Sequence, residues 1–72
     1  MPRISSKEAI RAFERLGFEQ VRQTGSHVVI KKQTEDGAIG CVVPMHRELK
    51  IGTLSGILKQ ARVTVEEFID SL

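Results

Sequence analysis

The 72-residue sequence has no tryptophan, no tyrosine and only three phenylalanines, and it contains a single cysteine. Stacking of nucleobases on aromatic side chains is therefore not an obvious binding mode, and an internal disulfide is impossible. A four-ligand zinc site would need Cys41, both histidines and a carboxylate, yet the sequence has no CxxC or HxxxH spacing. We expect a protein without a metal ion or other cofactor, suited to a reducing compartment.

Long apolar runs are also missing, since no stretch approaches the roughly 20 apolar residues that span a membrane. No signal-peptide pattern opens the sequence. We therefore expect a cytoplasmic protein without a membrane partner, folded as a single domain over residues 1–72. A core of this size stabilises weakly, which favours a binding partner.

The net charge of +2 is unevenly placed. Residues 1–62 contain all eleven lysines and arginines and carry a charge of +5, whereas residues 63–72 carry −3. A basic body favours a polyanion such as nucleic acid as a partner. The same distribution also suits an ordinary solvated surface, and charge alone favours that second interpretation.

Local signals predict a helix near the N-terminus of the chain. Ser5 and Glu8 fit a capping box at its start, and Gly17 is placed to end it in a left-handed conformation. Its apolar stripe comprises Ala9, Ile10, Phe13 and Leu16. Its basic outer ridge comprises Arg3, Lys7, Arg11 and Arg15. The two faces predict an amphipathic helix that packs on a core.

Three strands are expected next, at residues 18–23, 27–32 and 38–43, with short turns between them and Pro44 after the last. A loop follows at residues 44–51, and Gly52-Thr53 then opens a second helix. Its apolar face comprises Leu54, Ile57, Leu58 and Ala61. A last short helix starts at a second capping box, Thr64–Glu67, and its apolar residues are Val65, Phe68, Ile69 and Leu72. These elements predict an α+β fold of order αβββα plus a short C-terminal helix, with a three-stranded antiparallel sheet and helices packed on one face.

One histidine stands where the strongest predicted strand begins. Histidine takes and gives a proton near neutral pH, and alternation places His27 with Lys31 on the strand face opposite Val28 and Ile30. If the helices cover Val28 and Ile30, His27 and Lys31 share the open face. This pair fits metal-free RNA cleavage, in which a base deprotonates a ribose 2′-hydroxyl and a cation stabilises the phosphate. The same spacing also describes a surface histidine at a hairpin turn with no role, and spacing alone favours that interpretation.

The second histidine, His46, follows Pro44-Met45 in the predicted loop. It is a candidate for a second acid or base or for a phosphate contact, and it also fits an ordinary loop residue. The backbone N–H groups of Gly52-Thr53 suit a phosphate, or simply a helix start. No P-loop spacing is present, so nucleotide hydrolysis has no support.

Several short motifs follow one another in a specific order along nearly the whole chain. They are Leu16-Gly17-Phe18, Arg22–His27, Val28–Lys31, Val42–His46, Leu49–Leu54 and Ile57–Ala61. In this order and spacing, over about residues 6–70, the chain resembles the HicA toxins of bacterial type II toxin–antitoxin modules, also described as YcfA-like small RNA-binding domains. The resemblance implies a fold like that of the double-stranded-RNA-binding domain.

The same resemblance implies an activity, a site and a partner. The activity is that of an mRNA interferase, a metal-independent endoribonuclease that cleaves mRNA and blocks translation. The catalytic residue is His27, with Gly25 forming the turn and Ser26 supplying a supporting hydrogen bond. The implied partner is a HicB-type antitoxin that covers the active-site face. The expected RNA contacts are Arg22, Lys31, His46 and Lys50.

Two other functions stay open at this point. The basic ridge and the predicted fold also fit a non-catalytic RNA-binding module. A pure interaction protein, in which the sheet face holds a partner, is the third possibility.

Overall fold

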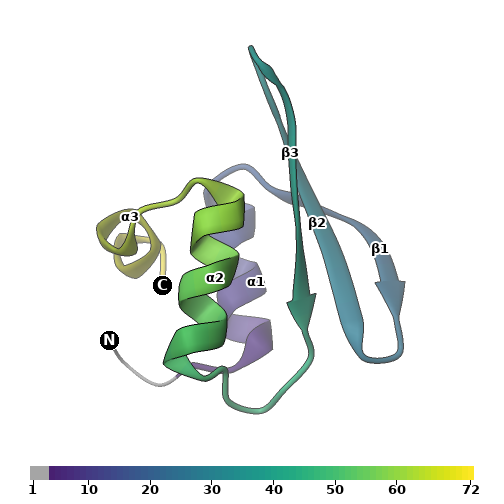
Figure 1. The fold of residues 1–72 in the computed structure, drawn as a ribbon, viewed down its shortest axis with the longest axis vertical. Helices are drawn as coiled ribbons and strands as arrows, with labels where there is room; N and C mark the ends of the chain where they lie inside the picture. The colour runs from purple at the N-terminus through teal and green to yellow at the C-terminus, as the bar shows by residue number, and fades with distance from the viewer. Residues whose placement is uncertain (1–3) are drawn as a thin grey trace.

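The structure is a computed structural model that describes residues 4–72, so Arg3 of the predicted basic ridge lies outside the described residues. The elements are α1 (Ser6–Arg15), β1 (Glu19–Thr24), β2 (His27–Thr34), β3 (Gly37–Pro44), α2 (Ile51–Ala61) and α3 (Val65–Asp70). The three helices lie on one side of the sheet (Figure 1). This confirms the α+β class and the αβββα order with a short C-terminal helix, the arrangement of a double-stranded-RNA-binding-domain-like fold. Within the described residues, no helix is long and apolar enough to cross a membrane.

Both predicted capping boxes are present. The backbone N–H of Glu8 donates to Ser5 Oγ at 3.2 Å, and its carboxylate accepts from the Ser5 backbone N–H at the same distance. At the start of α3, Thr64 and Glu67 make the equivalent pair of bonds, at 3.0 and 3.1 Å. Helix α2 differs, because it begins at Ile51, ahead of the predicted Gly52-Thr53 start, and has no side-chain cap.

The sheet has the strand order β1-β2-β3, and both pairings are antiparallel. Gly37 adopts a φ of 120° at the turn between β2 and β3, as the Asp36-Gly37 signal predicted. Strands β2 and β3 run longer than predicted, and Pro44 is the last residue of β3. The register between β1 and β2 shifts between Gln20 and Arg22, which leaves Val21 as the extra residue of a bulge.

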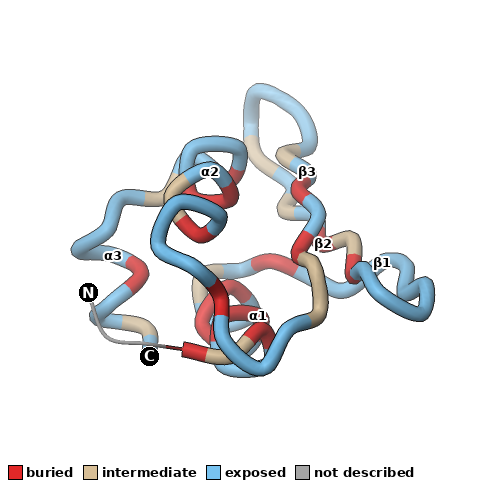
Figure 2. Tube along the Cα trace, turned by 60° about the horizontal axis from the view of Figure 1, so that its bottom comes forward, coloured by how far each residue is buried: buried red, intermediate tan, exposed pale blue. Residues whose placement is uncertain are grey.

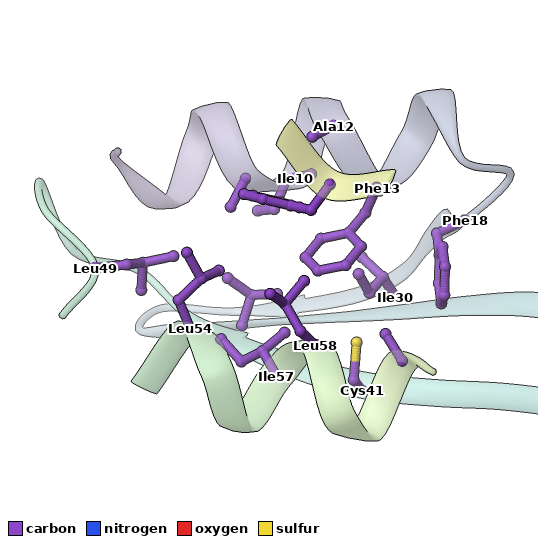
Figure 3. Close-up of a cluster of buried hydrophobic side chains, with 14 of the residues drawn as sticks. Ile10, Ala12, Phe13, Phe18, Ile30, Cys41, Leu49, Leu54, Ile57 and Leu58 are labelled. Atoms are coloured by element: carbon purple, nitrogen blue, oxygen red, sulfur yellow. The ribbon is translucent and has the colours of Figure 1, made fainter. Parts of the chain in front are cut away.

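The core fills the space between the helices and the inner face of the sheet (Figure 3). Phe13 of α1 is fully buried and lies at its centre, with ring centroids 5.5 Å from Phe18 and 5.4 Å from Phe68. The predicted apolar face of α2 is buried throughout. Burial of these side chains fixes the helices against the inner face of the sheet, so the opposite face stays open to solvent.

Helix α3 does not bury the stripe that its sequence predicts. Only Phe68 is buried, whereas Val65, Ile69 and Leu72 are each about two-fifths exposed. The six-residue helix α3 packs only one apolar side chain, Phe68, beside α1, so its other apolar residues stay at the surface. Arg15 of α1 secures the end of α3 by donating from Nη1 to the Ser71 carbonyl at 2.7 Å.

Candidate functional site

His27 is the first residue of β2 and is exposed. It lies between Thr24 of β1 and Pro44 of β3, its partners in the two pairings. Val28 and Ile30 are 1% and 0% exposed, so they form the face covered by the helices. The imidazole therefore belongs to the open face, as the strand alternation predicted.

The hydroxyl of Ser26 engages one ring nitrogen of His27. Ser26 Oγ lies 2.9 Å from Nδ1 of His27, which leaves Nε2 as the nitrogen available to a second partner. The turn is also held to the neighbouring strand, because the Met45 backbone N–H donates to the Ser26 carbonyl at 2.8 Å. The histidine is thus oriented by its own chain neighbour, on a turn fixed to β3.

Gly25 lies in the turn between β1 and β2, as predicted, but the backbone conformation there does not require glycine. Its φ is not in the left-handed region, and a Cβ atom added there would meet nothing within 4 Å. An L-residue with a side chain is therefore compatible with the turn itself. The space above Gly25 is therefore open.

The predicted neighbour of His27, Lys31, is not close to it. Four residues along a strand separate the two Cα atoms by about 13 Å, and Val29 stands between them. Arg22 is nearer, because it pairs with Val29 and is the diagonal cross-strand neighbour of His27, a relationship that spans about 7–8 Å. By strand register, Arg22 is therefore closer than Lys31 to the imidazole.

His46 is exposed, but the backbone around it is firmly held. Ser6 at the start of α1 is fully buried, donates from Oγ to the Pro44 carbonyl, and accepts from the His46 N–H at 2.8 Å. The Ser6 N–H also donates to the His46 carbonyl at 3.1 Å. These bonds join positions about 40 residues apart, and no sequence pattern indicated them.

The cations of the loop after β3 form a second group. Arg47 and Lys50 line a hollow together with His46, Glu48 and Thr53. Arg47 was not predicted as a site residue, although its place beside His46 was visible in the sequence. The predicted RNA contacts therefore divide in two, with Arg22 and Lys31 on the open face and His46 and Lys50 in the loop beyond β3.

Two titratable groups outside this region respond to their surroundings. Burial raises the pKa of the Cys41 thiol from its ordinary 9.0 to about 11, so the thiol is not a nucleophile at neutral pH. The backbone N–H of Thr64 lowers the pKa of the Glu67 carboxyl, with help from the Thr64 hydroxyl. In residues 4–72, histidine, cysteine, aspartate and glutamate side chains form no group of three that could hold a metal ion.

A comparison with known protein families finds one family that matches most of the chain. The family described as the HicA toxin of bacterial toxin–antitoxin systems matches residues 6–63, from the first residue of α1 to the residue before the Thr64 cap of α3. No curated protein matches the sequence. The match spans most of the 72 residues and includes the Ser26–His27 pair, the loop with His46 and all three strands. The chain therefore belongs to the HicA toxin family of bacterial toxin–antitoxin systems.

Proposed function

We propose that this toxin is an mRNA interferase, a metal-independent endoribonuclease that cleaves mRNA and so blocks translation. The observation that carries the proposal is the Ser26–His27 pair, an exposed imidazole held at Nδ1 by a hydroxyl on a fixed turn. A general base needs this combination of a set orientation and an open second nitrogen. Membership of a toxin family adds a reason for the protein to act on an essential cellular polymer.

The proposed reaction is a transesterification at one phosphodiester. Nε2 of His27 takes the proton of the ribose 2′-hydroxyl, the 2′-oxygen bonds to phosphorus, and the bond from phosphorus to the 5′-oxygen breaks. In the tautomer that serves as base, Nδ1–H donates to Ser26 Oγ. The leaving 5′-oxygen takes its proton from solvent water or from His46, and the products end in a 2′,3′-cyclic phosphate and a 5′-hydroxyl.

Charge on the phosphate needs a cation close to the imidazole. Arg22 takes this role because its register position is diagonal to His27, and a guanidinium presents two parallel donors to phosphate oxygens. Lys31, about 13 Å along the strand, holds a flanking phosphate instead. The loop cations near His46 contact the RNA further along its backbone.

The open face also suits the antitoxin, which we propose is of the HicB type. Val29 in the centre strand pairs with Val42 of β3, and Val42 is 43% exposed. Val21 at the bulge of β1 is 51% exposed and opens on the same hollow as Lys31. Val29 and Val42 lie next to His27 on the open face, and Val21 extends the apolar surface toward Lys31. A partner that covers these three valines also excludes RNA from the imidazole. Toxin, mRNA and antitoxin would then meet in the cytoplasm.

RNA with altered riboses tests the proposed activity. The full chain, purified free of antitoxin, is incubated with RNA in excess EDTA, and the cleavage site is mapped. A second RNA carries 2′-O-methyl ribose at that site. We expect cleavage of the first RNA with cyclic phosphate ends and none of the second at that position. Loss of cleavage in EDTA, or equal cleavage of both RNAs, would contradict the mechanism.

Two further outcomes would favour the other functions. Binding of RNA without any cleavage by clean protein would make the chain a non-catalytic RNA-binding module. Neither binding nor cleavage at moderate salt would leave an interaction protein that acts through its sheet face.

A further inference from the structure

Strand β1 carries polar residues where its inner face should be apolar. Gln20 pairs with Ile30 and Gln23 pairs with Val28, so both amides lie on the side of the sheet that faces the helices. Their partners are buried, yet both glutamines are exposed, as is β1 along its whole length (Figure 2). A local departure of this kind from the core pattern is expected at functional sites.

The two glutamines open on a groove between α1 and β1. Lys7, Arg11 and Glu14 of α1 line the opposite side of this groove. Its apolar lining comprises Ile10, Val28 and Met45. None of the described residues that line it is aromatic. Ile10 and Val28 are almost fully buried, so Met45 supplies most of the apolar surface. The groove thus combines amides, cations and a small apolar surface, which suit the base edge, the phosphate and the base face of a nucleotide.

The groove continues toward the proposed catalytic region. Lys7 and Met45 also line the next hollow, together with His46 and Arg47, and these two line the hollow that contains Lys50. Met45 is the residue whose N–H fixes the Ser26 carbonyl. Gln23 precedes Thr24, the β1 partner of His27. The groove lies on the helix side of the sheet and the imidazole on the open face, so an RNA strand along the groove reaches His27 by passing over the turn between β1 and β2.

We propose that the groove between α1 and β1 binds one nucleotide of the RNA near the scissile phosphate and sets the sequence preference of cleavage. The amides of Gln20 and Gln23 contact a base edge that offers a donor beside an acceptor, and Lys7 and Arg11 contact the phosphate of that nucleotide. A glutamine amide supplies one acceptor and two donors, so it distinguishes base edges as a cation does not. This inference rests on the proposed ribonuclease function and adds its specificity.

Cleavage of a randomised RNA pool, sequenced at the new ends, tests the specificity. The full-length chain without antitoxin is compared with Gln20→Ala, Gln23→Ala and the control Gln60→Ala, whose side chain lies exposed on α2, away from the groove. Removal of one bidentate amide–base pair should weaken the preference at one position by about fivefold to about 150-fold. The thermal midpoint should change little in all three variants, because the substituted residues are exposed, and Gln60→Ala should also keep the preference of the parent.

The phosphate contacts have a second, independent readout. Lys7→Ala and Arg11→Ala, each made in a His27→Ala chain that cannot consume the RNA, should weaken binding for all sequences. Each should also reduce the slope of log affinity against log salt by about 0.7, the value for one single-stranded phosphate contact. Lys59→Ala removes the same charge from an exposed position on α2 and should leave the slope unchanged.

The outcomes separate this inference from the function on which it rests. If the wild-type chain cleaves RNA but its preference is the same in the glutamine variants and in Gln60→Ala, the specificity site is wrong and the ribonuclease stands. If those variants weaken antitoxin binding alone, the groove belongs to the partner and the inference is overturned. If the wild-type chain binds RNA without cleaving it, the salt slopes of the lysine and arginine variants still decide whether RNA occupies the groove.

Discussion

Ser26 Oγ lies 2.9 Å from Nδ1 of His27, the residue that follows it in the chain. The bond leaves Nε2 free and gives the exposed ring one preferred orientation. It also depends on the turn being fixed, which the bond from the Met45 N–H to the Ser26 carbonyl achieves. The local pair and the contact to Met45, the residue after β3, together hold the imidazole in place on the open face.

Removal of the Ser26 hydroxyl should slow cleavage without unfolding the protein. Because a neutral hydrogen bond contributes about 1 kcal/mol net, Ser26→Ala should lower the cleavage rate by roughly fivefold. Ser26→Thr keeps a hydroxyl and should recover most of that loss. Rates are measured under single-turnover conditions across a range of pH, with thermal midpoints for both variants. Equal rates for Ser26→Ala and the parent would show that the hydroxyl does not position the ring.

A methyl group at Gly25 should be tolerated by the fold. The backbone there needs no positive φ and the space is open, so Gly25→Ala should hold or raise the free energy of unfolding, by up to about 0.4–1 kcal/mol. Urea unfolding measures this. A marked loss of stability would instead show that this turn requires glycine.

The buried hydroxyl of Ser6 should matter for stability and for the loop that contains His46. Ser6→Ala removes the acceptor of the His46 N–H and the donor to the Pro44 carbonyl, and should lower the free energy of unfolding by about 1–3 kcal/mol. Ser55→Ala, a partly exposed serine on α2, is the control and should change it by less than about 0.5 kcal/mol. Equal effects of the two substitutions in urea unfolding would refute this role.

We expect the Cys41 thiol to make the free energy of unfolding fall at alkaline pH. Burial raises its pKa from 9.0 to about 11, so the folded chain keeps the proton at pH values where the unfolded chain has lost it. Stability should therefore be insensitive to this group below pH 9 and fall as pH rises from 9 to 11. Urea unfolding of the parent and of Cys41→Ala at several pH values isolates the effect, which should be absent in the variant. Parallel pH curves for the two proteins would contradict it.

Much of the fold was predictable because its signals are local. The Ser5–Glu8 and Thr64–Glu67 boxes each join residues three apart, and Gly37 supplies a positive φ at the turn that its dipeptide predicts. The alternation of side chains along β2 correctly placed Val28 and Ile30 on one face and His27 on the other, because this part of β2 has a regular period of two.

The remaining features depend on contacts between distant residues. No short sequence pattern predicts the bonds of Ser6 to the loop after β3. The same is true of the packing of α3, which buries only Phe68. The shared face of His27 and Lys31 was predictable, but a shared face does not bring together two residues four positions apart on one strand. The groove between α1 and β1 depends on the bulge and on how α1 lies against the sheet. The sequence alone therefore did not indicate Gln20 and Gln23 as site residues.

The most direct test of the account is the RNA cleavage rate of His27→Ala against the parent chain, both free of antitoxin and prepared identically. The exposed position of His27 predicts that the variant keeps its fold, which circular dichroism and a thermal midpoint verify. Loss of a general base predicts a rate lower by about 10²–10⁴-fold. A folded His27→Ala chain that cleaves RNA as fast as the parent would contradict the central claim that this imidazole carries the chemistry.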